Sequence, residues 1–164
     1  MKLETLKDLF HHELKDLYSA EKQIIDALPK MIEGASNAEL KTALEDHLEV
    51  TREHLARIED IAEQLDLKPG GHKCKGMEGV IEEGSELLEE DAEKNVRDAG
   101  IIGAAQRVEH YEMAAYGTAR THAAKLGFHD VAEELQKTLD EEGEADRLLS
   151  RLAERSINFE ALVT

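Results

Sequence analysis

The sequence is poor in the residues that mark several common classes of protein. Its 164 residues include a single cysteine, Cys74, which excludes an internal disulfide bond. Two prolines, no tryptophan and only 4% aromatic residues mean that a packed core must be built from aliphatic side chains. No apolar run reaches membrane-spanning length, and the charged amino-terminal residues do not resemble a secretion signal. We therefore expect a cytoplasmic location and no membrane partner.

Basic residues are also scarce relative to acidic ones. The chain has 20 lysine and arginine residues against 37 aspartate and glutamate residues, which gives a formal net charge of −17. Proteins bind nucleic acids largely through lysine and arginine contacts to phosphate, so this balance argues against a nucleic-acid partner. A strongly acidic protein attracts cations through its summed field. The same charge would also simply keep an ordinary protein soluble, so composition alone does not decide between these two interpretations.

Apolar residues recur at steps of three and four along most of the chain, which is the spacing of an amphipathic helix. We predict one all-α domain over residues 1–164, a ferritin-like four-helix bundle. The predicted long helices cover residues 3–34, 36–67, 92–126 and 129–156, with Ser36 as the N-cap of the second. Pro29 should kink or end the regular part of the first helix. A long crossover between the second and third helices, with a short extra helix over residues 77–90, is typical of ferritin-like topology.

Polar residues interrupt the apolar face near the middle of each long helix. Ionisable side chains are rarely buried without a partner, and several buried carboxylates suppress each other's ionisation. A bound divalent or trivalent cation would supply the missing positive charge. Carboxylates with an imidazole, and no thiolate, suit iron or manganese. The predicted metal ligands are Glu21 on the first helix, His47 on the second, Glu109 and Glu112 on the third, and Glu142 and Asp146 on the fourth.

Most of these residues also have an ordinary explanation when taken one at a time. Glu21 could lie half exposed at the edge of the bundle, His47 could be a hydrogen-bonded core histidine, and Glu142 could belong to a solvated acidic face. The joint pattern across four helices is what favours a metal site. His54 is the reserve ligand on the second helix. The hydroxyl groups of Tyr18, Tyr111 and Tyr116 could orient ligands, with ordinary packing as the alternative, above all for Tyr111.

Three motifs resemble those of the YciE/YciF family of bacterial stress-associated proteins. They are Tyr18-Ser-Ala-Glu-Lys-Gln23, Lys73-Cys74 followed by Met77-Glu-Gly79, and Ala104-Ala-Gln-Arg-Val-Glu-His-Tyr-Glu112. The resemblance extends over nearly the whole chain. It implies a ferritin-like bundle of the rubrerythrin type that commonly forms a dimer, so we expect a homodimer.

The resemblance also implies a pair of iron ions, with a known ligand pattern. Ferritin-like di-iron proteins place one Glu on the first helix, Glu-x-x-His on the second, Glu or Glu-x-x-Glu on the third, and Glu with His on the fourth. Glu21, Glu109, Glu112 and Glu142 match this pattern. Asp146 stands where a histidine is expected, and Leu44 stands where a glutamate should precede His47 by three residues. The implied site is therefore poor in histidine and short of one bridging carboxylate.

Two functions fit these observations. The first is a non-haem di-metal stress-response protein that binds iron or manganese and reacts with peroxide or oxygen. The second is a non-catalytic helical protein that dimerises and keeps only a structural or vestigial metal site. The sequence assigns no catalytic residue beyond the metal ligands.

Overall fold

The computed structural model describes residues 2–164, so Met1 of the predicted 1–164 domain lies outside it. The described residues are almost entirely helical and form no strand, which confirms the predicted all-α class. None of their helices is both long enough and apolar enough to cross a membrane. The helices are α1 (Leu6–Gly34), α2 (Ala38–Gln64), α3 (Lys75–Glu89), α4 (Lys94–Lys125), α5 (His129–Leu152) and α6 (Asn158–Leu162), with a π-helical turn (Ala153–Ile157) before α6.

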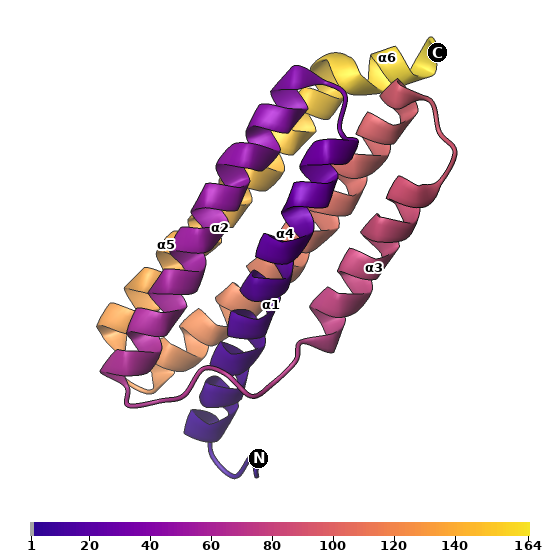
Figure 1. Ribbon diagram of the computed structural model, residues 1–164. Coiled ribbons are helices and arrows are strands. Elements are labelled where there is room, and N and C mark those ends of the chain that lie inside the picture. The colour runs from indigo at the N-terminus through magenta and orange to yellow at the C-terminus, as the bar shows by residue number, and fades with distance from the viewer. Residues whose placement is uncertain (1) are drawn as a thin grey trace.

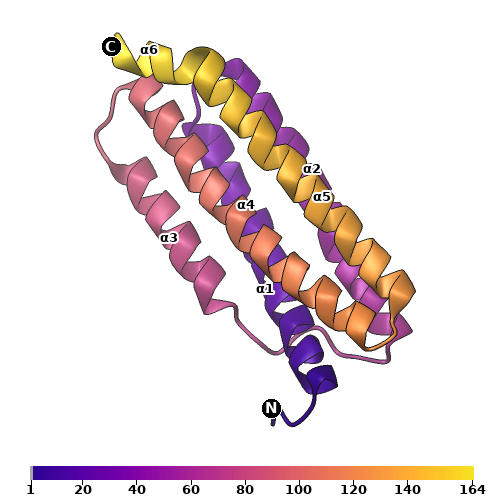
Figure 2. The same ribbon diagram turned by 180° about the vertical axis from the view of Figure 1, so that it is seen from behind.

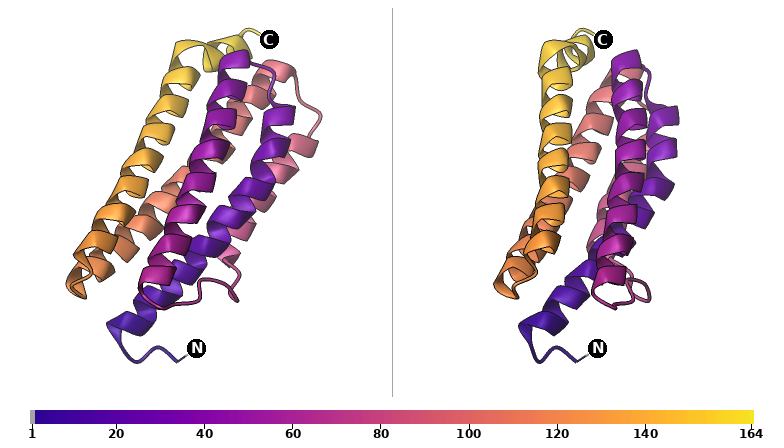
Figure 3. Two further views of the ribbon diagram at one scale, coloured as in Figure 1. Left: turned by 60° about the vertical axis from the view of Figure 1, so that its left-hand side comes forward. Right: turned by 90° about the vertical axis from the view of Figure 1, so that its left-hand side faces the viewer.

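The long helices α1, α2, α4 and α5 lie side by side, and each packs against two of the others (Figure 1). The short helix α3 lies outside them and packs against α1 and α4, as the view from behind shows (Figure 2). The chain leaves α2 at one end of the molecule and returns along α3 to the opposite end. For this reason α2 and α4 run in the same direction (Figure 1). The side views in Figure 3 show α6 turning across the end of the molecule, where it contacts α4.

The ends of the first helices differ in detail from the prediction. Asn37, not Ser36, caps α2, because its side-chain oxygen accepts hydrogen bonds from the backbone N–H groups of Glu39 and Leu40. Helix α1 continues through Pro29 to Gly34, so the proline does not end it. The turn between α1 and α2 is held by the buried Asp98 of α4. Its two oxygens accept hydrogen bonds from the backbone N–H groups of Ser36 at 2.7 Å and Asn37 at 2.8 Å.

The apolar core is divided into two clusters along the length of the helices. Leu17 of α1 belongs to one cluster, and Ile24 belongs to the other. Val108 and Tyr116 of α4 are divided between the clusters in the same way. The glutamates between these residues therefore lie in a polar layer with apolar packing on both sides, where water has little access and an unpaired charge is costly.

Candidate metal centre

Four glutamates are buried in the polar layer. Glu21 of α1, Glu109 and Glu112 of α4, and Glu142 of α5 are each at most 2% exposed. Each occupies an inward position in the helical repeat of its own helix, so the helical period alone directs its side chain to the centre. The structure therefore brings together five of the six ligands predicted from the sequence, namely these four glutamates and His47 of α2.

These side chains form two groups that share one member. One ligand atom from each of His47, Glu109, Glu112 and Glu142 lies within 4.8 Å of all the others. A second group with the same spacing contains Glu142 again, with Glu21 and His54. Such spacing allows one ion to contact all members of a group. Glu142, as the shared member, is placed to bridge two ions.

The distances show how each histidine approaches its group. In the first, His47 Nε2 lies 3.2 Å from Glu109 Oε1 and 3.9 Å from Glu142 Oε2. In the second, His54 Nδ1 lies 2.8 Å from Glu142 Oε1 and 3.7 Å from Glu21 Oε1. Both histidines come from α2, two turns apart, so the two groups follow one another along the helix axis.

Most of the converging oxygen atoms have no hydrogen-bond partner among residues 2–164. Both oxygens of Glu112, both oxygens of Glu142 and one oxygen each of Glu21 and Glu109 are buried and unpaired. His47 Nε2 and His54 Nδ1 likewise make no well-aligned hydrogen bond, although they lie 3.2 Å from Glu109 Oε1 and 2.8 Å from Glu142 Oε1. Buried polar atoms are normally satisfied, and leaving one unsatisfied costs about 1–3 kcal/mol. So many unsatisfied ligand atoms around one point are best explained by a cation that they would bind.

The carboxyl groups strongly perturb one another's ionisation. Burial, followed by the neighbouring Glu142 charge, raises the pKa values of Glu109 and Glu112 well above their usual range. Burial also raises the pKa of Glu21 from 4.5 to about 8. Glu142 behaves differently. Burial opposes its ionisation too, but contacts with Glu109 and His54 lower its pKa to about 2. In the absence of a metal, the group therefore keeps most of its protons and concentrates its negative charge on Glu142.

The two histidines also differ in the direction in which their pKa values are shifted. Burial lowers the pKa of His47, which favours the neutral imidazole that a metal ion requires. Burial acts in the same direction on His54, but the Glu142, Glu21 and Glu141 carboxylates outweigh it and raise the pKa of His54. A metal ion at the second group would therefore have to displace a proton from His54.

Two further contacts orient the candidate ligands. His54 Nε2 lies 3.0 Å from Glu141 Oε2, and the same oxygen accepts a hydrogen bond from Arg57 at 2.8 Å. A carboxylate on the outer nitrogen of a ligating histidine fixes the ring and its tautomer. The Tyr116 hydroxyl donates a hydrogen bond to Glu21 Oε1, as the sequence suggested. The other two tyrosines do not reach the centre, because Tyr18 donates to Glu59 at 3.3 Å and Tyr111 to Asp16 at 3.0 Å. Glu141 and Arg57 were missed, although Arg57 follows His54 by one helical turn and so shares its face.

Asp146 and the second helix depart from the expected ligand pattern. The Asp146 carboxylate accepts a hydrogen bond from Gln106 at 2.9 Å and lies 3.2 Å from His110 Nε2, outside both groups. Three residues before His54, where a bridging glutamate is expected, stands the buried Thr51. Its hydroxyl donates a hydrogen bond to the His47 carbonyl oxygen of its own helix at 2.8 Å, so it is not directed at the centre.

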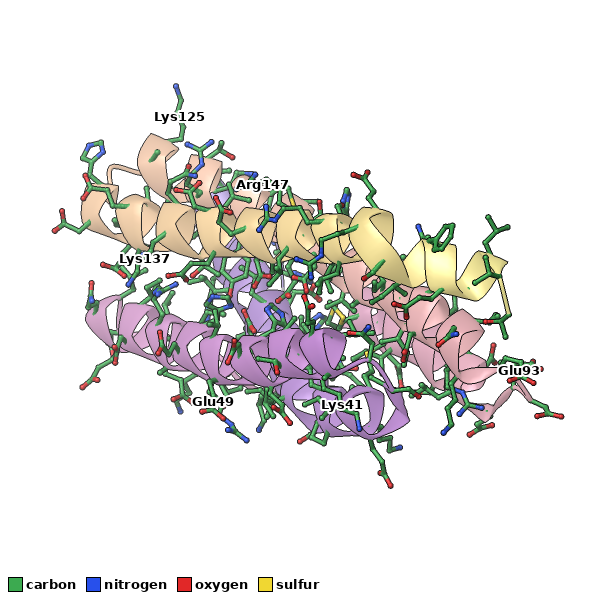
Figure 4. The ribbon with its side chains drawn as sticks, turned by 90° about the horizontal axis from the view of Figure 1, so that it is seen from above. Lys41, Glu49, Glu93, Lys125, Lys137 and Arg147 are labelled. Atoms are coloured by element: carbon green, nitrogen blue, oxygen red, sulfur yellow. The ribbon has the colours of Figure 1, made fainter. Side chains whose placement is uncertain are left out.

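The donor set fits iron or manganese. All candidate ligand atoms are carboxylate oxygens or imidazole nitrogens, and Cys74 belongs to neither group. The only ion pairs of the four buried glutamates within residues 2–164 are with His47 and His54. Lysine side chains such as Lys125 extend away from the helices (Figure 4). The protein itself therefore places no permanent positive charge among these acids.

Comparison with known proteins places this chain in a family. The family described as "Domain of unknown function (DUF892)" matches residues 5–162. The chain belongs to this family. It is 44% identical to protein YciF of Escherichia coli strain K12 over 162 residues, which cover 98% of each chain. The resemblance to the YciE/YciF family noted in the sequence is thereby confirmed.

Two solved structures of similar proteins show a closely similar fold. The crystal structure of the E. coli stress protein YciF matches with a TM-score of 0.92 and 44% identity, over 95% of this chain and 99% of that one. The YcfI protein of Rhodopseudomonas palustris matches with a TM-score of 0.88 and 43% identity, over 91% and 95% of the two chains. One relative is thus described as a stress protein, and the other carries a provisional description as a structural protein.

Proposed function

We propose that this chain is a ferritin-like four-helix bundle that binds two iron ions, or manganese in their place, and reacts with peroxide or oxygen in a stress response. The observation that carries the proposal is the pair of ligand groups sharing Glu142, with their buried and unpaired oxygen atoms. Family membership supports the stress-related role, because YciF is described as a stress protein.

The residues of the chain would divide the work as follows. His47, Glu109 and Glu112 would hold one ion, Glu21 and His54 the other, and Glu142 would bridge them. When bound, two iron ions supply two electrons, one from each, which is what reduction of peroxide requires. Glu141 and Arg57 would fix the His54 ring, and Tyr116 would fix Glu21. The apolar clusters on both sides of the layer would exclude bulk water.

Metal analysis tests the proposal directly. Metal-free protein is loaded anaerobically with ferrous iron, freed of excess metal and analysed by mass spectrometry, and we expect two iron ions per chain. Anomalous diffraction at the iron edge should place them between His47 and Glu109 and between His54 and Glu21. A chain that retains no iron or manganese after this treatment would refute the proposal.

A non-catalytic role is the second candidate, and two observations favour it. The bridging glutamate expected on α2 is absent, because Leu44 and Thr51 occupy the positions three residues before the two histidines. The provisional description of YcfI as a structural protein points in the same direction. In this case the metal would stabilise the fold without turnover. The loaded protein would then melt at a higher temperature than the metal-free protein but would consume neither peroxide nor oxygen.

We also propose that the chain forms a homodimer. Phe159, Leu162 and Val163, at the carboxyl-terminal end, are large apolar residues that are more than 60% exposed. Such a patch is a candidate for contact with a second copy. Sedimentation equilibrium should give twice the mass of one chain, and replacing Phe159 and Leu162 with serine should lower it to the mass of one chain.

A further inference from the structure

Pockets of contrasting chemistry reach His47 of the candidate metal centre. Between α2 and α5 an open groove has His47 in its wall and is lined by acids that include Asp46, Glu53 and Glu141. On another side, between α1, α3 and α4, lies a partly enclosed cavity of about 30 Å³ whose wall includes His47 and Glu109. The acidic groove suits a cation, whereas the more apolar cavity does not.

The wall of this cavity is almost wholly aliphatic. Ile24 and Leu28 come from α1, Val80 from α3, and Ala105 and Val108 from α4. The only other polar or charged side chains in the wall, besides the two ligands, are those of Lys30 and Ser85. Lys30 is exposed and Ser85 half-buried. The cavity thus has an apolar interior with metal ligands as its main polar feature.

Helix α3 closes the cavity from outside, and a glycine allows it to come close. A Cβ atom at the buried Gly84 would lie 3.4 Å from Ala104 Cβ and 3.8 Å from Met31 Cε. A larger side chain would push α3 away from α1 and α4. The close packing of α3 over the cavity therefore depends on the glycine at this position.

We propose that this cavity is a binding site for dioxygen beside the metal pair, so that dioxygen rather than peroxide is the oxidant the chain is built to receive. The inference rests on the proposed di-metal function and names its substrate. A volume of about 30 Å³ exceeds the roughly 10–15 Å³ that one water molecule needs. Water and hydrogen peroxide would lose hydrogen bonds on entering such a space, whereas the apolar dioxygen molecule loses none and leaves water favourably.

Xenon tests the cavity without any catalytic readout. Xenon occupies apolar cavities in proteins and is located by its anomalous scattering. Crystals of the metal-free wild-type protein pressurised with xenon should show a peak between Ile24, Val80 and Ala105. Ordered water in place of xenon would overturn the inference, because it would show that the cavity is wet.

A matched pair of variants tests whether the cavity serves the metal centre. Ala105 and Ala123 are both buried alanines of α4, but Ala123 does not line the cavity and lies about 27 Å further along the helix axis. Ala105→Val should abolish the xenon peak and slow oxidation of bound ferrous iron by dioxygen about tenfold. Oxidation by hydrogen peroxide should change far less. Ala123→Val should leave the xenon peak and both rates close to wild type.

The two proposals fail in different ways. Iron binding without a xenon peak, or equal slowing of both oxidants in Ala105→Val, overturns the dioxygen site and leaves the metal centre intact. A xenon peak in a chain that takes up no iron overturns the metal centre, and with it any role of the cavity in metal oxidation. Helical circular dichroism and iron content of both valine variants show whether a slower rate has a trivial cause in unfolding or metal loss. If Ala105→Val fails this check, the wild-type xenon experiment decides the question.

Discussion

Two of the buried acids of helix α4, Asp98 and Glu112, lie at different heights, and their surroundings are opposite. Asp98 is 2% exposed, and each of its oxygens accepts a backbone N–H from the turn that starts α2. Glu112 is 0% exposed, and neither of its oxygens has a hydrogen-bond partner within residues 2–164. The N–H groups at a helix start stabilise the charge of Asp98, whereas Glu112 faces further carboxyl groups. Burial alone therefore does not mark a candidate metal ligand, and the lack of hydrogen-bond partners is what distinguishes Glu112 from Asp98.

The largest expected effect in this comparison is the loss of metal on removal of the shared ligand. Replacing Glu142 with alanine takes a carboxylate from both groups at once. The affinity for ferrous iron should fall by at least about 100-fold, beyond the range of a lost outer-shell contact. Isothermal titration calorimetry under anaerobic conditions measures this change.

Asp146→Ala is the matched control, one turn further along α5. Because the Asp146 carboxylate is directed at Gln106 and His110, this variant should keep two iron ions per chain. Loss of iron from Asp146→Ala would show that Asp146 is a ligand after all, as the sequence suggested.

The pH dependence of the metal-free protein should reveal the unpaired acids. Because the folded-state pKa of Glu21 is raised from 4.5 to about 8, the folded chain retains a proton that the unfolded chain releases between these values. The free energy of unfolding should therefore be highest near pH 5 and decrease by about 3 kcal/mol as the pH rises to 8. The raised pKa values of Glu109 and Glu112 also make the folded chain less stable as the pH rises. The lowered pKa of His47 has the opposite effect on stability as the pH rises towards 6.5, the usual pKa of histidine. Urea denaturation at each pH measures this slope.

Metal should reverse this trend. Iron competes with protons for the same carboxylates, so its apparent affinity should rise over the same pH range. Glu21→Gln supplies the control, because it should flatten the slope of the metal-free protein. Stability of the metal-free wild type that rises from pH 5 to pH 8 would contradict the ionisation scheme.

Removal of Asp98, the buried acid whose hydrogen bonds are satisfied, should destabilise the fold without affecting metal binding. Asp98→Ala leaves two backbone N–H groups of the α1–α2 turn without their charged acceptor, which should cost about 2 kcal/mol. The midpoint of urea denaturation should fall, and the iron content should remain at the wild-type value. Asp98→Asn retains one acceptor oxygen, so its denaturation midpoint should lie between those of the wild type and Asp98→Ala. A normal denaturation midpoint for Asp98→Ala would mean that water replaces the carboxylate at no cost.

The smallest expected effect has the opposite sign. Glu112→Gln replaces a carboxyl group, whose pKa burial and the neighbouring Glu142 charge raise well above its usual range, by a neutral amide of similar shape. At pH 8 the metal-free variant should be about 1 kcal/mol more stable than the wild type, although it binds iron less tightly. Thermal melting of the metal-free proteins at pH 8 measures the difference. A lower melting temperature for Glu112→Gln would place Glu112 with Asp98 as a structural acid.

Much of this arrangement could be predicted from the sequence. The spacing of apolar residues indicated the long helices, and the same period indicated that Glu21, Glu109, Glu112 and Glu142 point inward. Element boundaries were less accurate. The predicted helix over residues 129–156 ends at Leu152 and passes into a π-helical turn and then α6, because no glycine or proline marks its end. The N-cap of α2 was misplaced by one residue because Ser36 and Asn37 are both good caps.

Periodicity by itself determined which face of each helix each acid occupies, since side-chain direction repeats every 3.6 residues whatever the helix packs against. Only the tertiary structure decided which of those residues meet. The axial offset and rotation of α5 against α2 and α4 bring His54 to Glu142 and turn Asp146 towards Gln106, although Asp146 follows Glu142 by a single turn. Such offsets depend on packing between helices, which a single helical repeat does not encode.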